Sequence, residues 1–157
     1  MVATVKPRRR MVVHGTTVAL GRVGVLIRGR SGAGKSDLAL RLIDEGARLV
    51  ADDLTQLGLA RGVLRATAPD TVPARLVGRI EVRGMGIFAV PRRPSARLGL
   101  VVDLRPGGGI ERLPAPSHWR CLGRAVPLIV LDPASPSAAA KVRLAARVRR
   151  RSIIPLP

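Results

Sequence analysis

A short glycine-rich motif constrains this chain more than any other feature. An apolar run at residues 23–27 precedes it, and apolar residues at helical spacing, including Leu38 and Leu42, follow it. The motif fits the pattern G-x-x-x-x-G-K-[ST] and reads Gly29-Arg30-Ser31-Gly32-Ala33-Gly34-Lys35-Ser36. In such a loop the backbone N–H groups point at phosphate oxygens, and the next helix directs its positive end there. The motif therefore predicts a strand–loop–helix unit that binds a nucleoside triphosphate.

Within this loop, Lys35 can reach the β- and γ-phosphates, and the Ser36 hydroxyl can hold Mg²⁺. A carboxylate at the end of a neighbouring strand must assist the metal, and three places offer one. Asp103 and Asp132 each end an apolar run, and Asp52-Asp53 follows the short run at residues 48–51. Adjacent carboxylates repel, and two nearby cations would offset that repulsion, which favours Asp52-Asp53. Strand-end turns are the plain alternative for Asp103 and Asp132.

The remaining pattern predicts a single α/β domain. A hairpin and loop are expected between residues 54 and 73, with a turn at Arg61-Gly62, and Cys121 is expected to be a small buried residue. Ser135 is expected to cap a helix over residues 138–151, with Pro136 in its first turn. Other expected strands cover residues 79–90, 98–104 and 127–131, and loops are expected at 106–109 and 114–119, the second holding His118 and Trp119. The domain boundaries are a basic arm at 1–10, the catalytic domain at 11–135, and a basic helix and tail at 136–157.

Charge and composition exclude several classes of protein. The 157 residues carry a formal net charge of +18, and 46% of them are hydrophobic, too many for a disordered basic tail. No apolar run approaches the ~20 residues of a membrane span, and the first ten residues lack the apolar core of a secretory signal. One cysteine excludes an intrachain disulfide. We therefore expect a cytoplasmic protein without a membrane partner.

A formal net charge of +18 suggests nucleic acid as a partner. Phe88 and Trp119 are the only aromatic residues, too few for the stacking platforms of single-strand binders. Binding to duplex phosphates needs no aromatic residue and stays open as an alternative. The excess charge is concentrated in acid-free stretches at residues 1–10 and 141–151. Nucleic acid is therefore not the expected partner; an acidic protein is.

Four stretches of the sequence resemble the catalytic domain of bacterial HPr kinase/phosphorylase, over roughly residues 11–133. Two are residues 23–36, which hold the glycine-rich motif, and residues 48–53, which end in Asp52-Asp53. The other two read Val13-His14-Gly15-Thr16 and Ile80-Glu81-Val82-Arg83-Gly84-Met85-Gly86-Ile87. The last resembles the family signature, which has no counterpart in generic P-loop ATPases.

The resemblance implies a P-loop fold related to phosphoenolpyruvate carboxykinase, with a mixed β-sheet. It also implies transfer of the ATP γ-phosphoryl to a serine of the phosphocarrier protein HPr, in regulation of the phosphotransferase system and carbon metabolism. By position, Asp53 would be the base, Ser36 and Glu81 the Mg²⁺ ligands, and His14, Lys35 and Arg112 further active-site residues. Without the family, His14 would close a strand, Glu81 would face outward, and Arg112 would be a surface charge.

The sequence also departs from the family pattern. The family's separate N-terminal domain has no counterpart before His14, which indicates a short form. Of the family's dephosphorylation loop only Gly123-Arg124 is matched, so kinase activity is expected and phosphorolysis stays open. The family's C-terminal helix helps bind HPr and assembles hexamers. Here Arg143, Arg147 and Arg150 share a helix face that either meets an acidic surface, of HPr or of a neighbouring subunit, or is simply solvated. A P-loop kinase or NTPase for another substrate, using Asp103 or Asp132, is the alternative.

Overall fold

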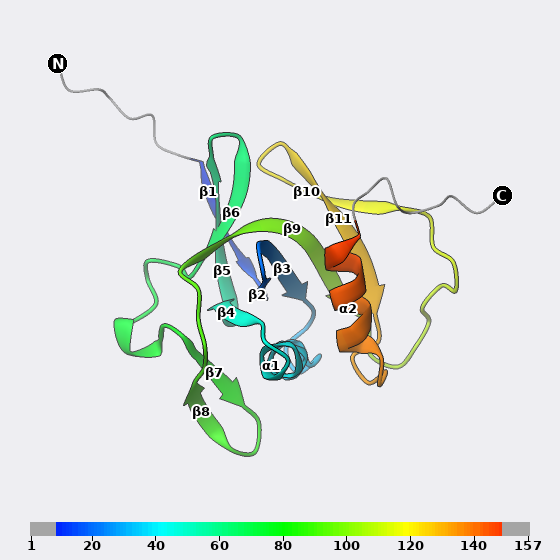
Figure 1. The fold of residues 1–157 in the computed structure, drawn as a ribbon, viewed down its shortest axis with the longest axis horizontal. Helices are drawn as coiled ribbons and strands as arrows, with labels where there is room; N and C mark the ends of the chain where they lie inside the picture. The colour runs from blue at the N-terminus through cyan, green and yellow to red at the C-terminus, as the bar shows by residue number, and fades with distance from the viewer. Residues whose placement is uncertain (1–8, 149–157) are drawn as a thin grey trace.

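The computed structural model describes residues 9–148, which form a curled mixed β-sheet with two α-helices on one side (Figure 1). The elements of the main sheet and the two helices are β1 (Arg10–His14), β2 (Thr16–Leu20), β3 (Val23–Arg28), α1 (Lys35–Asp44), β4 (Arg48–Ala51), β5 (Leu54–Ala60), β6 (Val63–Thr67), β9 (Ser95–Leu104), β10 (Ser117–Cys121), β11 (Arg124–Leu131) and α2 (Ala138–Arg147). A 3₁₀ turn (Ala74–Leu76) and a separate two-stranded sheet of β7 (Arg79–Val82) and β8 (Gly86–Ala89) lie between β6 and β9.

Strand β9 organises the main sheet, whose order is β1-β5-β6-β9-β3-β2-β4, with β11 also beside β9 and β10 beside β11. It runs parallel to β3 and β11 and antiparallel to β6. β6 pairs with the first residues of β9 and β11 with the last, so β9 curves through the centre of the fold (Figure 1). The carboxyl ends of β3, β9 and β11 therefore meet at one edge, where an open α/β sheet binds its ligands.

The buried apolar side chains form two separate clusters, because successive side chains of a strand point to opposite faces of the sheet. On β3, Val25 and Ile27 are buried with Leu38 and Leu42 of α1, whereas Leu26 is buried in the second cluster, inside the curl of the sheet. Successive side chains of a strand point to opposite faces, so a strand covered on both faces must be apolar throughout. That requirement explains the unbroken apolar run that precedes the glycine-rich motif.

Several expected elements differ from the observed ones. The hairpin of β5 and β6 with its turn at Arg61-Gly62 is confirmed. The expected loop at 114–119 is wrong, because residues from Ser117 onward form β10; this strand is largely exposed, and its pairing with β11 stabilises it without an apolar signature. Ser135 is not the cap of α2: Ser137 holds the N-cap position and makes no side-chain cap bond. The expected end of this helix, at residue 151, lies outside the described residues.

Neither α1 nor α2 is long and apolar enough to cross a bilayer, and no other helix in residues 9–148 is either.

Candidate active site

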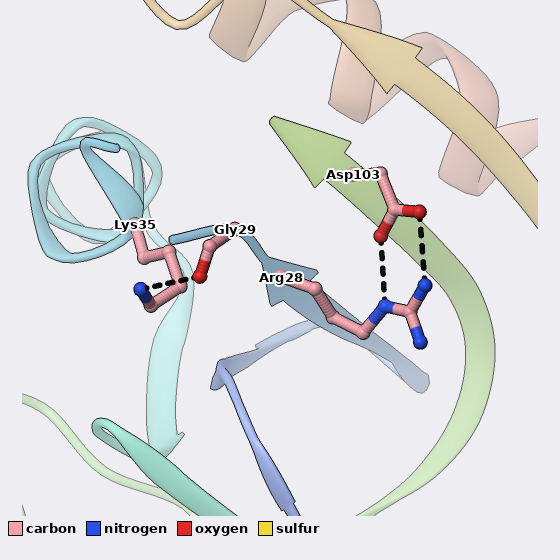
Figure 2. Close-up of polar contacts among 4 residues, drawn as sticks. All are labelled: Arg28, Gly29, Lys35 and Asp103. Carbon is pink, nitrogen blue, oxygen red and sulfur yellow. Dashed lines mark hydrogen bonds and ion pairs between the residues drawn. The ribbon is translucent and has the colours of Figure 1, made fainter. Parts of the chain in front are cut away.

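The glycine-rich loop leaves the end of β3 and runs directly into α1. Gly32 and Gly34 have φ angles of 80° and 99°, which L-residues with a side chain rarely adopt. The Lys35 ammonium donates to the carbonyls of Gly29, at 2.9 Å, and Arg30, at 3.0 Å (Figure 2). Both acceptors are neutral carbonyls, which a charged phosphate oxygen can replace as the stronger acceptor.

A cluster around Asp52 lies next to this loop. The Ser36 hydroxyl, from the first turn of α1, donates to Asp52 Oδ1 at 2.9 Å. Thr16, fully buried at the start of β2, donates to the same oxygen at 2.9 Å, and the Glu81 N–H donates to Asp52 Oδ2 at 3.4 Å. Three elements far apart in the sequence thus converge on the carboxylate that follows β4.

Asp53 is held in an unusual backbone conformation beside this cluster. Its φ is 64°, a left-handed value that costs a non-glycine residue roughly 1–2 kcal/mol. Its N–H donates to Thr16 Oγ1 at 3.3 Å, and its carbonyl accepts from the Gly15 N–H at 2.8 Å. Because His14 pairs with Leu54, the structure brings His14 and Asp53 together at the same edge. Strain of this kind is often stored at functional sites.

A cavity of about 480 Å³ opens on the other side of the loop. The Arg28 guanidinium makes a two-pronged ion pair with Asp103 there, at 2.7 and 2.9 Å (Figure 2). It also stacks 5.0 Å from the centre of the Trp119 ring. The residues lining the cavity are His14, Arg28, Gly29, Arg30, Asp103, Leu104, Arg105 and Val130. Its charged groups are mainly arginines, so an anion would be favoured in it.

The two alternative metal acids are engaged elsewhere. Asp103 is the partner of Arg28. Asp132 Oδ1 accepts from the Ala134 N–H at 2.9 Å, the pattern of a turn-forming aspartate. Of the three places that the sequence offered, only Asp52-Asp53 meets the Ser36 hydroxyl.

Three predicted residues do not join this cluster. Arg112 lies exposed in the irregular segment between β9 and β10. Leu122 and Gly123 form the tight turn between β10 and β11, and Arg124 begins β11, whereas the loop edge lies at the other end of β11, where Leu131 pairs with Leu104. At ~3.3 Å per residue the two ends are roughly 20 Å apart, so the assignment of Gly123-Arg124 to a dephosphorylation loop stays a prediction.

The expected basic face of α2 is also partly engaged within the chain. Arg143 pairs with Glu45 at the end of α1, so its guanidinium is engaged within the chain, and its predicted contact with an acidic partner stays a prediction. Arg147 Nε donates to the carbonyl of Arg143 at 3.2 Å. Arg150 lies outside the described residues. The ion pair instead holds α2 against α1.

Sequence reasoning missed two parts of the site. Thr16 entered only as a neighbour of His14, because nothing local marks a threonine that supports a distant carboxylate. The segment after β11 was also missed: a Cβ on Gly34 would lie 3.3 Å from the Pro133 Cβ, and Arg41 of α1 donates to the Pro133 carbonyl at 2.7 Å. Arg83 of the signature reaches the loop as well, 3.8 Å from where a Cβ on Gly32 would be.

The oxygen atoms of this cluster fit a magnesium ion. The Ser36 hydroxyl and the Asp52 carboxylate are hard donors of the kind that Mg²⁺ prefers, and Glu81, which joins the cluster through its backbone N–H, carries a further carboxylate. Within residues 9–148 no group of three or more His, Cys, Asp or Glu side chains could enclose a metal. Magnesium in nucleotide sites takes only one or two carboxylates and completes its shell with phosphates and water, so the small donor set suits it.

Comparison with known proteins shows that the chain is similar to HPr kinases. A family model described as the HPr serine kinase C-terminal domain matches residues 6–102. The HPr kinase/phosphorylase of Clostridium novyi is 47% identical over 89 residues, which are 57% of this chain and 27% of that protein. That of Xanthomonas campestris pv. campestris is 39% identical over 137 residues, which are 78% of this chain and 42% of that protein.

A solved structure gives the same result. The Hpr(Ser) kinase/phosphatase from Coxiella burnetii superposes with a TM-score of 0.71 at 27% identity, covering 86% of each chain. This chain belongs to the HPr serine kinase C-terminal domain family. It spans well under half the length of the curated relatives named above.

Proposed function

We propose that this protein transfers the γ-phosphoryl group of ATP to a serine of HPr, with Mg²⁺ as the metal. The observation that carries the proposal is the Ser36–Asp52–Thr16–Asp53 chain of hydrogen bonds, which joins the phosphate-binding loop to the backbone N–H of Asp53, a residue held at a left-handed φ. The names of the relatives support HPr as the substrate. The curled mixed sheet supports the expected relation to the phosphoenolpyruvate carboxykinase fold. Action on HPr would give the protein a cytoplasmic role in the phosphotransferase system.

Different residues of the chain have different roles in the proposed phosphoryl transfer. The backbone N–H groups of the glycine-rich loop and Lys35 hold the phosphates and stabilise the charge that develops on them. Asp53 accepts the proton of the serine hydroxyl as the phosphoryl group arrives. His14, at the end of the strand that pairs with the segment after Asp53, would help to orient the acceptor. Ser36, Asp52 and Glu81 would hold Mg²⁺. When bound, the metal would neutralise charge on the β- and γ-phosphates.

The reverse reaction uses the same groups. Asp53, once protonated, would return its proton to the serine oxygen as inorganic phosphate removes the phosphoryl group and forms pyrophosphate. Gly123 and Arg124, the proposed match to the dephosphorylation loop, lie at the far end of β11, whereas Arg83 and the segment at Pro133 both lie against the glycine-rich loop.

The test is transfer of label from ATP to purified HPr, with an HPr variant that lacks the acceptor serine as the blank. Lys35→Ala and Asp53→Asn should each lower the rate at least ~100-fold, the usual contribution of a positioned base. Asparagine tolerates the left-handed φ of residue 53, so Asp53→Asn removes the base and preserves the fold. Asp132→Asn is the matched control and should retain activity within a few-fold. No transfer by the wild type would refute the proposal.

The alternative of a P-loop kinase or NTPase with Asp103 as the metal acid predicts the opposite pattern. Asp103→Asn would then abolish activity, and Asp53→Asn would spare it. The ion pair of Asp103 with Arg28 argues against that alternative, because the carboxylate is already neutralised.

A further inference from the structure

The hairpin of β7 and β8 leaves a set of apolar side chains in water. It stands apart from the main sheet as a second, two-stranded sheet (Figure 1). Met85 is 72% exposed, Ile87 56% and Phe88 41%, and Leu76, just before the hairpin, is 39% exposed. Phe88 is paired with the buried Ile80 and points to the opposite side from Ile87, so we call Met85 and Ile87, the two most exposed of these residues, the hairpin surface. Exposed large apolar side chains next to one another can mark a contact site.

One face of the hairpin is already used by the fold, and the other is not. Ile80 is fully buried in the core cluster with α1, and Val82 packs against that cluster. Residues directly opposite in an antiparallel pair point to the same side. Glu81 is paired with Ile87, so these two share the outer face, next to the cluster that Glu81 joins through its N–H bond to Asp52. Because the Ile87 side chain is 56% exposed, it contributes little to the stability of the fold.

Charge around the hairpin surface selects the kind of partner. Arg75, Arg79, Arg83 and Arg92 are exposed in and next to the hairpin in the sequence, whereas Arg93 donates to the Gly21 carbonyl, and Glu81 is the one acid between residues 71 and 94. None of these arginines takes part in a salt bridge among the described residues. A second copy of this chain would bring the same positive charge and be repelled, whereas an acidic partner would be attracted.

We propose that the hairpin surface is the docking site for the protein substrate, through an apolar patch that lies beside the acceptor serine and is bordered by acidic residues. The contact seats the serine within reach of Asp53, because the hairpin and Asp53 adjoin the same Asp52 cluster. This inference rests on the proposed transfer to a protein serine and adds how that substrate is recognised. Met85 and Ile87 supply the apolar contact, and the arginines orient the approach.

The experiment compares steady-state kinetics of the Met85→Gln/Ile87→Thr variant with those of the wild type, using HPr as the probe. The KM for HPr should rise at least tenfold, about 1.4 kcal/mol. The KM for ATP and the kcat at saturating HPr should stay within twofold, since no phosphate contact is changed. Val12→Thr is the matched control: Val12 is 51% exposed on β1, away from the hairpin, and its substitution should leave the KM for HPr unchanged. Raising the salt concentration should increase the wild-type KM for HPr, because it screens the arginines.

Three results would overturn the inference. If the wild type phosphorylates HPr and the double variant has an unchanged KM for HPr, only the docking site is wrong. If the double variant alters self-association in sedimentation and not the KM for HPr, the surface joins copies of this chain. If the wild type transfers nothing to HPr, the proposed function fails and this inference fails with it. Circular dichroism of the double variant must match the wild type, as expected for residues so exposed.

Discussion

Replacing Thr16 by valine removes one hydroxyl and changes the shape of the residue little. That hydroxyl donates to Asp52 Oδ1 at 2.9 Å and accepts from the Asp53 N–H at 3.3 Å, in a fully buried position. Valine can do neither. The carboxylate of Asp52 then loses a charged partner, and the strained backbone of Asp53 loses an acceptor.

The free energy of unfolding should fall by about 2–3 kcal/mol. A hydrogen bond to a charged group contributes roughly 1.5–3 kcal/mol, and an orphaned N–H adds about 1 kcal/mol or more. The extra methyl group of valine offsets about 0.8 kcal/mol of this loss. For a domain of this size, each kcal/mol shifts Tm by roughly 2–4 °C, so Tm should fall by about 5–10 °C.

Thr17→Val is the matched control, one residue along the same strand. Thr17 is also fully buried, but its hydroxyl meets only the neutral Thr55 hydroxyl at 2.9 Å, and Thr55 keeps its bond to the Gly15 carbonyl. Its loss should nearly cancel against the added methyl group. Thermal unfolding followed by circular dichroism measures both variants. An equal Tm change in the two would refute the view that Thr16 anchors Asp52. Thr16→Ser should retain phosphotransfer that Thr16→Val loses.

Three further predictions concern the rest of the fold. Asp103→Asn should lower the free energy of unfolding by about 1–2 kcal/mol, less than for a fully buried pair, and change the emission of Trp119, because the paired guanidinium stacks on that ring; an unchanged spectrum would contradict the stacking. A double-mutant cycle with Glu45→Gln and Arg143→Gln should give a coupling of about 0.5–1 kcal/mol, and zero coupling would mean that the pair does not hold α2 on α1. Burial raises the pKa of the Cys121 thiol, so the unfolded chain ionises first. Stability should therefore fall more steeply in the wild type than in Cys121→Ala as pH rises above about 8.5, and parallel curves in urea titrations would contradict this.

Local features of the fold were predictable from the sequence. The strand before the glycine-rich loop is apolar throughout because it is buried on both faces, and the loop needs glycine where φ is positive. The hairpin of β5 and β6 follows from its Arg61-Gly62 turn. In these places, neighbouring residues alone determine the conformation.

Features that depend on distant partners were not predictable. Strand β10 has no apolar pattern, and its pairing with β11 decides its conformation. Arg143 looked like part of a solvent-facing basic stripe until α2 was placed against Glu45 of α1. Family resemblance named Asp53, but the support given by Thr16 to both aspartates depends on three strands meeting at one edge.

The central position of β9 has a consequence for how the chain reaches its native state. Before Ser95, the chain can form two local ribbons, β2 with β3 and β4, and β5 with β1 and β6. Only β9 pairs with a strand of each ribbon, through pairs as distant in sequence as Val25 with Leu100. Such non-local pairing folds slowly, and until it forms the free edges of β3 and β6 can pair with other chains. A chain that stops before Ser95 should therefore aggregate rather than fold into a smaller nucleotide-binding unit.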